Sequence, residues 1–206
     1  MTAARKIVIV GVTASIAAYK ACEIVNLLRK DSFDVRVIVT KDALEFVTPL
    51  TLQTLSGNKV LADIFEPLER WSPVHTSLAD SASLVLIAPA TANVIGKLAN
   101  GICDDLLTCV TYASKAPVLI APAMNENMYN HKVVMANIAR LEKIGYAFIG
   151  PVKGRLACGH DGQGHIAPVP EIIKEVKRIL FVSTNKNRSA GGFRRIINRS
   201  NRSTER

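Results

Sequence analysis

The stretch 83-SLVLIAPA-90 decides how we interpret the fold. It is apolar at almost every position, and it is short enough to be a strand rather than a helix. A strand with one face in solvent alternates apolar and polar residues, whereas this segment offers apolar side chains to both sides. Such a pattern is typical of a strand in a parallel sheet that is covered by helices on both faces.

Four further segments have the same character, and helical patterns lie between them. The other strands are expected at 6-KIVIVGV-12, 34-DVRVIVT-40, 117-PVLIAPA-123 and 146-YAFIG-150. The clearest helix has one apolar stripe, made of Ala17, Ala18, Ala21, Ile24, Val25 and Leu28. Strands that alternate with helices imply right-handed crossovers. The sequence therefore predicts a Rossmann-type α/β fold, with a doubly wound parallel sheet between two helical layers.

The remaining elements are predicted from the same periodicities. Further helices are expected over 41–57, 91–100, 103–114, 131–144 and 169–180. The Gly- and Pro-rich segment 151–168 is expected to be a loop, and 179-ILFVST-184 a short strand or the start of a linker.

Length and composition indicate one globular domain. The chain has 206 residues, of which 49% are apolar and 21% charged, which suits a single well-packed core. We expect this domain to cover 1–180 and a basic tail to cover 181–206. No apolar run approaches the roughly 20 residues of a membrane span. The apolar run after Arg5 and Lys6 is too short for a signal peptide, so we expect a cytoplasmic protein that does not bind membranes.

The positive charge is concentrated in the tail. The formal net charge is +9. Residues 186–206 contain seven Lys or Arg and one Glu, a net +6, which leaves +3 for the rest of the chain. A tail of this composition is typical of a solvated extension, so no nucleic-acid partner is expected. The alternative is a loose, salt-sensitive contact with RNA or DNA.

The four cysteines do not form a metal-binding pattern. Cys22, Cys103, Cys109 and Cys158 give neither a CxxC motif nor a zinc-finger spacing, and we expect thiols and no bound metal. Cys22 and Cys109 lie in apolar helical patterns and are predicted to fill the core, while Cys103 is left undecided. Cys158 lies in a glycine-rich segment, which is an unusual setting for a structural cysteine.

Small polar residues follow four of the predicted strands. They occur at 13-TAS-15, at Thr40, in 89-PATAN-93 and in 122-PAMN-125. Any one of them could be a helix cap, but ligands of such folds collect where strand ends meet. Hydroxyl groups and free N–H groups at helix N-termini suit a phosphate.

The pattern does not fit a dinucleotide. The segment 11-GVTASIA-17 lacks the GxGxxG glycines, and Thr40-Lys41 stands where an acidic residue is expected to bind the ribose. A mononucleotide with one phosphate and a flat ring, such as flavin mononucleotide (FMN), fits better.

Five segments together resemble the flavin-containing cysteine decarboxylases. They are 11-GVTASIAAYK-20, 75-HTSLAD-80, 88-APATANVIGKLANGICDDLL-107, 121-APAMNENM-128 and 154-GRLACGHDGQG-164. The resemblance is strongest to the branch that acts on phosphopantothenoylcysteine in coenzyme A biosynthesis. It implies a flavodoxin-like fold, FMN as cofactor, and a homo-oligomer that is a trimer or a dodecamer of trimers. Matched positions imply FMN contacts at Ala14, Ser15, Ile16, Thr40, Thr91, Ala92, Asn93 and Ala123.

The same resemblance implies roles in decarboxylation. In the family's reaction the flavin oxidises the substrate thiol, CO₂ is lost, and the resulting ene-thiol is reduced to the saturated product. Asn125 would hold the substrate carboxylate through its amide. Met128 would help to line the pocket. The alternative is that its flexible side chain fills a gap in the core. Glu126 and Asn127 are expected only to cap the following helix.

Two residues would transfer protons in this reaction. His75, just before an expected helix start, would be the acid/base for the thiol. Cys158 would donate a proton to the ene-thiol, since a thiol of ordinary pKa is mostly protonated at pH 7. By the same match Ala157 and Gly159 would contact the substrate from a mobile flap. The flap departs from the family at His165, where an Arg is common.

Other functions stay open at this point. An oxidative decarboxylase of C-terminal peptidyl-cysteine would not need Cys158, and a flavin prenyltransferase would not need both His75 and the PAMN segment. A non-catalytic regulatory subunit or an electron-transfer flavoprotein would need none of His75, Asn125 and Cys158. In many bacteria the decarboxylase is fused to a ligase that joins cysteine to phosphopantothenate. Here a basic tail follows instead, so we expect ligase activity to be absent from this chain. Either the ligase is a separate protein or the chain is a shortened bifunctional one, and both alternatives stay open.

Overall fold

The core of the protein is one parallel β-sheet. The computed structural model describes residues 5–65, 74–155, 159 and 161–181. Five parallel strands form the sheet in the order β2-β1-β3-β4-β5. Val10 of β1 is in register with Val37 of β2 on one side and with Leu86 of β3 on the other. This strand order is that of flavodoxin-like folds, so the predicted fold class is confirmed. The strands are β1 (Ile7–Val12), β2 (Asp34–Val39), β3 (Leu84–Ala90), β4 (Val118–Pro122) and β5 (Ala147–Phe148).

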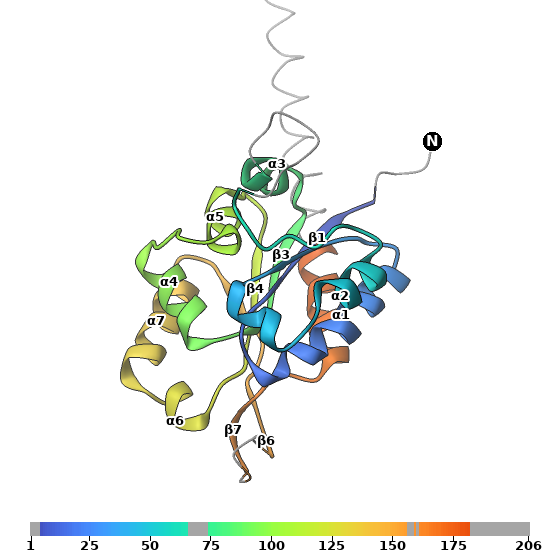
Figure 1. Cartoon of the computed structure of the whole chain (residues 1–206). Coiled ribbons are helices and arrows are strands. Elements are labelled where there is room, and N and C mark those ends of the chain that lie inside the picture. Colours follow the sequence, from blue (N-terminus) through green and yellow to red (C-terminus); the bar gives the residue numbers. More distant parts are fainter. Residues whose placement is uncertain (1–4, 66–73, 156–158, 160, 182–206) are drawn as a thin grey trace, which may run out of the picture.

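Helices cover both faces of the sheet (Figure 1). One face packs against η1 (Ile16–Tyr19), α1 (Lys20–Lys30), α2 (Pro49–Ser56) and a helix over 169–181. The other face packs against α3 (Val74–Ser81), α4 (Ala92–Asn100), α5 (Leu106–Ala113) and α7 (Lys132–Lys143). Two short elements, η2 (Lys41–Glu45) and α6 (Glu126–Tyr129), follow β2 and β4.

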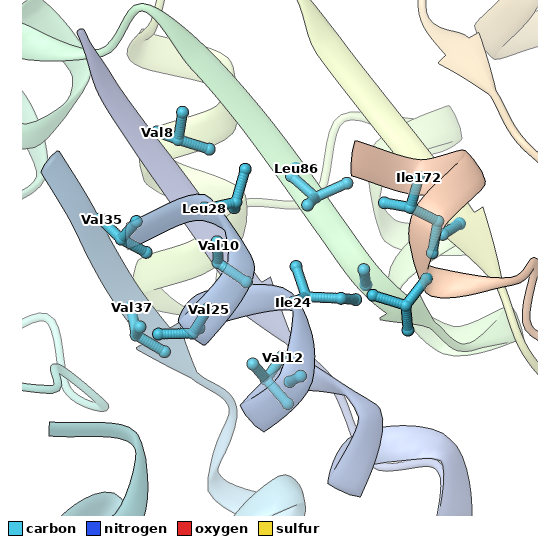
Figure 2. Close-up of a cluster of buried hydrophobic side chains, with 14 of the residues drawn as sticks. Val8, Val10, Val12, Ile24, Val25, Leu28, Val35, Val37, Leu86 and Ile172 are labelled. Carbon is cyan, nitrogen blue, oxygen red and sulfur yellow. The ribbon is translucent and has the colours of Figure 1, made fainter. Parts of the chain in front are cut away.

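Successive residues of the strands supply two separate cores, as the two-sided apolar pattern predicts. Figure 2 shows alternate valines of β1 packed against the apolar stripe of α1, and Ile172 of the helix over 169–181 in the same cluster. Ile9, between those valines, points to the opposite core. Full burial of each such side chain stabilises the fold by about 1.5–3 kcal/mol.

Two predicted elements differ from the observed ones. The single helix expected over 41–57 is interrupted, and α2 begins only at Pro49, with Thr48 as its cap. Proline has no N–H and is tolerated in the first turn of a helix. The loop expected over 151–168 instead contains an antiparallel hairpin, made of β6 (Val152–Arg155) and β7 (Asp161–His165).

The C-terminal predictions are only partly covered by the described residues. The helix expected over 169–180 is confirmed, and it continues to residue 181. The strand alternative for 179–184 is therefore wrong at its beginning, while 182–206 lies outside the described residues. Over the part of the chain that the structure describes, no helix combines the length and the apolar character that membrane crossing requires.

Candidate functional site

The candidate site lies at the carboxyl ends of β1 and β3. After β1 the chain moves to β2 on one side, and after β3 it moves to β4 on the other. Such a switch in direction is where flavodoxin-like folds bind ligands. The two ends are joined by Thr13, which is 2% exposed. Its Oγ1 donates to the carbonyl of Pro89 at 2.8 Å and accepts from the N–H of Thr91 at 3.0 Å.

Helix caps account for two of the polar residues that follow the strands. Ser15 Oγ accepts a hydrogen bond from Ala17 N at 3.3 Å at the start of η1. Thr91 Oγ1 accepts from Val94 N at 3.4 Å at the start of α4. Thr40 precedes η2 but makes no capping hydrogen bond with its side chain. Capping therefore explains Ser15 and Thr91 locally and leaves the hydroxyl of Thr40 without that role.

Two adjoining cavities open around these strand ends. We call them the hairpin cavity, of about 640 Å³, and the β2-side cavity, of about 670 Å³. They share Ala14, Thr91 and Met128. All eight positions predicted to contact FMN line one or both of them, namely Ala14, Ser15, Ile16, Thr40, Thr91, Ala92, Asn93 and Ala123. Each volume is in the ordinary range for small-molecule sites.

The PAMN segment is also brought to the hairpin cavity. Asn125 lines it and caps α6, since its Oδ1 accepts from Asn127 N at 2.9 Å. Met128 lines both cavities and is 49% exposed. The alternative that Met128 fills the core is therefore wrong.

Glu126 does not supply the expected cap, since Asn125 caps α6, but it binds the hairpin. Its Oε1 accepts a hydrogen bond from Gln163 N of β7 at 3.1 Å. A second bond joins Met124 N to Gly164 O at 3.1 Å. The backbones approach so closely here that a Cβ on Gly164 would lie 2.1 Å from Met124 O. The base of the hairpin is thus fastened to α6 and the end of β4.

The outer part of the predicted flap is only partly described. Gly159 is exposed and has φ +90°, a conformation that favours glycine. Ala157 and Cys158 lie outside the described residues, so their predicted roles stay predictions. His165 lines the hairpin cavity together with Arg155, which sequence reasoning did not select.

His75 is not brought to this site within one chain. It lies in the first turn of α3 and lines neither cavity. Helices α3 and α6 are at opposite ends of the sheet in Figure 1. Among the described residues, the buried Nδ1 of His75 has no hydrogen-bond partner. His75 and Asn125 therefore do not line a common cavity within a single chain, among those described.

A partly buried charge cluster in the wall of the β2-side cavity was not predicted. Lys97 Nζ lies 2.7 Å from Asp104 Oδ1 and 3.0 Å from Asp105 Oδ2. Burial alone would raise the pKa of Asp105, but hydrogen bonds from Thr108 and Lys97 lower it overall. The sequence signal was the Asp105-x-x-Thr108 spacing of a capping box, which the structure contains at the start of α5.

The described cysteines have different environments. Cys22 packs against the core as predicted, and burial raises the pKa of its thiol. Cys109 is half-buried rather than part of the core, and its thiol donates to the carbonyl of Cys103 at 3.4 Å. Cys103 itself is exposed. Within the described ranges, no cluster of three His, Cys, Asp or Glu side chains could hold a metal ion.

Comparison with known proteins identifies the family. The model of the Flavoprotein family matches residues 1–181. This chain belongs to the Flavoprotein family. It is 48% identical over 178 residues to the coenzyme A biosynthesis bifunctional protein CoaBC of Bacillus subtilis, covering 86% of this chain and 44% of that protein. The chain therefore spans less than half the length of the curated relatives that it matches first.

Other relatives match over nearly their whole length. The probable phosphopantothenoylcysteine decarboxylase of Streptococcus mutans is 40% identical over 177 residues, which cover 85% of this chain and 99% of that protein. A solved PPC decarboxylase mutant complexed with pantothenoylaminoethenethiol superposes with a TM-score of 0.76 at 31% identity, covering 84% and 97% of the two chains. The FMN-binding protein AtHal3 gives a TM-score of 0.73 at 31% identity, covering 84% and 96%.

Proposed function

We propose that this chain is an FMN-dependent decarboxylase that converts phosphopantothenoylcysteine to phosphopantetheine in coenzyme A biosynthesis. The observation that carries the proposal is the convergence of all eight expected FMN positions on two adjoining cavities, one of which is also lined by Asn125. The names of the Streptococcus mutans relative and of the solved PPC decarboxylase support the same reaction. We further propose a cytoplasmic location, where the described cysteines would stay thiols. Ligation of cysteine to phosphopantothenate by a separate protein stays a prediction.

The residues around the cavities suit a flavin mononucleotide. The loops after β1 and β3 run directly into the first turns of η1 and α4, whose free N–H groups suit a phosphate. Because Ala14, Ala92 and Ala123 have short side chains, a flat ring could lie against the backbone beside them. Bound FMN would supply a reversible two-electron acceptor for the substrate thiol.

Asn125 is suited to orient the substrate carboxylate. Its Oδ1 is engaged in the cap of α6, which fixes the position of the amide beside the hairpin cavity. The amide nitrogen is a neutral donor, so it can align a carboxylate without the full ion pairing that would stabilise the ground state before CO₂ leaves.

We propose that His75 reaches this site from a second copy of the chain. Within one chain His75 is far from Asn125, while Ile16 and Tyr19 beside the hairpin cavity are 61% and 57% exposed. Homo-oligomers usually close by rotational symmetry, which places the same two surfaces together at every interface. A trimer, or a dodecamer built from trimers, would give each site one Asn125 and one His75 from different copies.

The reaction itself is tested with purified protein reconstituted with FMN. The visible spectrum should show bound flavin, and phosphopantothenoylcysteine should lose the mass of CO₂ without a change in oxidation level. A product lighter by two further hydrogens would indicate oxidative decarboxylation instead. A colourless preparation or an unchanged substrate would refute the proposed function.

The shared site is tested by mixing two inactive variants. His75→Asn and Asn125→Ala chains are co-expressed with different tags, and the mixed oligomers are purified. If each site takes the two residues from different copies, one site in every mixed trimer regains both wild-type residues, so roughly one third of the sites of the purified mixed trimers should be active. If both residues acted within one chain, every site would lack one of them, and the mixture would be as inactive as each variant alone.

A further inference from the structure

Two of the cysteines lie close together where α4 connects to α5. Cys103 is in the irregular segment between these helices, and Cys109 is in the first half of α5. The thiol of Cys109 donates to the carbonyl of Cys103 at 3.4 Å. Because a cysteine sulfur lies at most about 5 Å from its own carbonyl oxygen, the two sulfur atoms are within about 8 Å of each other.

The backbone around Cys103 can bring the two sulfur atoms into contact. Residues 102–104 belong to neither helix nor strand, whereas Cys109 is held by α5. The sulfur of Cys103 has only a long contact with the carbonyl of Gly101, at 4.0 Å. A disulfide requires Cα atoms about 4.4–6.8 Å apart. The helix therefore fixes one sulfur, and rotation and movement of the irregular segment can supply the other.

The two thiols differ in their accessibility to reagents. Cys103 is exposed, while Cys109 is half-buried. Burial raises the pKa of the Cys109 thiol, and the neighbouring Cys103 raises it further. Since the thiolate is the reactive form and must be accessible, a small disulfide in solution should react with Cys103 first. Cys109 is then placed to displace the small thiol from Cys103.

We propose that Cys103 and Cys109 form a redox site that low-molecular-weight disulfides, such as oxidised glutathione, convert to an intramolecular disulfide. The Cys103 thiolate attacks one sulfur of the reagent, and the other sulfur leaves as a thiol. The Cys109 thiolate then attacks the Cys103 sulfur, and a second small thiol leaves. Two protein thiols are thus oxidised while one reagent disulfide is reduced to two thiols. In a reducing cytosol the pair stays reduced, so the disulfide forms only when the pool of small disulfides rises.

This redox site is connected to the β2-side cavity. Asp104 follows Cys103 directly and lies 2.7 Å from Lys97, which lines that cavity. A disulfide that draws Cys103 toward α5 moves Asp104 away from Lys97 and loosens this part of the wall. Since the ion pair is partly exposed, FMN affinity should fall only about twofold to fivefold. This effect on FMN rests on the proposed function, whereas formation of the disulfide does not.

The test measures the two thiols directly in the full chain. The protein is equilibrated in glutathione buffers of increasing oxidised share, its remaining thiols are alkylated, and it is digested with trypsin. Cleavage after Lys97 and Lys115 gives one peptide, 98–115, that contains both cysteines and no other. Most of this peptide should become lighter by two hydrogens and unalkylated, and dithiothreitol should reverse the change. The tryptic peptide 21–29 contains Cys22, which packs against the core, and should stay alkylated.

Two variants separate the steps of the reaction. Cys109→Ser should stop at the mixed disulfide, so its peptide 98–115 should gain one glutathione. Cys103→Ser should leave Cys109 as a thiol, because the half-buried sulfur is the less accessible one. The FMN affinity of the wild type should fall on oxidation and recover with dithiothreitol, while that of Cys103→Ser should not change.

The inference is overturned if peptide 98–115 keeps two free thiols in the fully oxidised buffer. It is also overturned if the wild type only accumulates glutathione on Cys103, or if the cysteines join two chains. An unchanged FMN affinity in the fully closed sample would overturn the connection to the β2-side cavity. Failure of the proposed function is distinct, since a chain that neither binds FMN nor decarboxylates the substrate still gives the peptide result.

Discussion

Replacing Thr13 by valine should weaken both the fold and the site, because one hydroxyl joins the ends of two central strands. The side chain is buried, and its Oγ1 bonds to the carbonyl of Pro89 and the N–H of Thr91. Valine has nearly the same shape, so the substitution removes both hydrogen bonds without leaving a cavity. The buried carbonyl of Pro89 and the partly buried N–H of Thr91 then lose their partner.

The magnitude follows from those two groups. Leaving one buried polar group unsatisfied costs about 1–3 kcal/mol, and the added methyl group recovers about 0.8 kcal/mol. The net loss in free energy of unfolding should therefore be about 1–5 kcal/mol. Because Thr91 begins α4 within the cavity wall, affinity for FMN should also fall by at least about tenfold.

Urea unfolding and flavin titration measure the two effects, and Thr111→Val is the matched control. Thr111 is equally buried, and its hydroxyl donates to the carbonyl of Leu107 at 2.7 Å. That carbonyl is also engaged inside α5, so the control should lose less than about 1 kcal/mol. Thr13→Ser keeps the hydroxyl and should retain most of the flavin affinity. The reasoning is refuted if Thr13→Val is no less stable than Thr111→Val.

The remaining predictions concern the hairpin and the cluster of Lys97, Asp104 and Asp105. Gly164→Ala should raise KM for the substrate, because the added Cβ would overlap Met124 O and push the hairpin away from the end of β4. The thermal midpoint should change little, since the main sheet stays intact. An unaltered KM would contradict a role of this hairpin contact in substrate binding. The folded pKa of Asp105 lies below its ordinary value of 3.8, so the folded state binds fewer protons there and the unfolding free energy falls as pH drops through that region. Asp105→Asn keeps the cap toward Thr108 but loses the charge beside Lys97. Its free energy of unfolding, measured with urea, should therefore fall less steeply than that of the wild type as the pH drops from about 5 to 2.

The strands could be predicted from sequence because their environment is uniform. The central strands β1, β3 and β4 are buried on both sides, so a short apolar run is sufficient to locate each of them, and the strand ends then indicate where ligands collect. Ala14, Thr91 and Asn125 are correctly brought together by this reasoning. Pairwise contacts such as those of Thr13 could not be derived, since they depend on which strands are neighbours in the sheet.

The hairpin could not be predicted, because it lacks the signal of a strand. Its sequences 152-VKGR-155 and 161-DGQGH-165 contain few apolar or β-branched residues. The hairpin is fastened by tertiary contacts, including the bond from Gln163 N to Glu126, and sequence periodicity does not report these. The break before α2, unlike the hairpin, could have been predicted, because Thr48 followed by Pro49 is a sequence signal for the start of a helix.

The position of the site has a mechanical consequence. Ala14 and Thr91, which both cavities share, follow central strands that are hydrogen-bonded on both sides and joined by Thr13. Arg155 and His165, which line the hairpin cavity, lie instead on a two-stranded sheet outside the core, fastened at its base by hydrogen bonds from Gln163 and Met124. Local opening generally costs less where fewer buried contacts are lost. Ligand exchange at the hairpin can therefore occur while the strand ends that would hold the flavin remain in place.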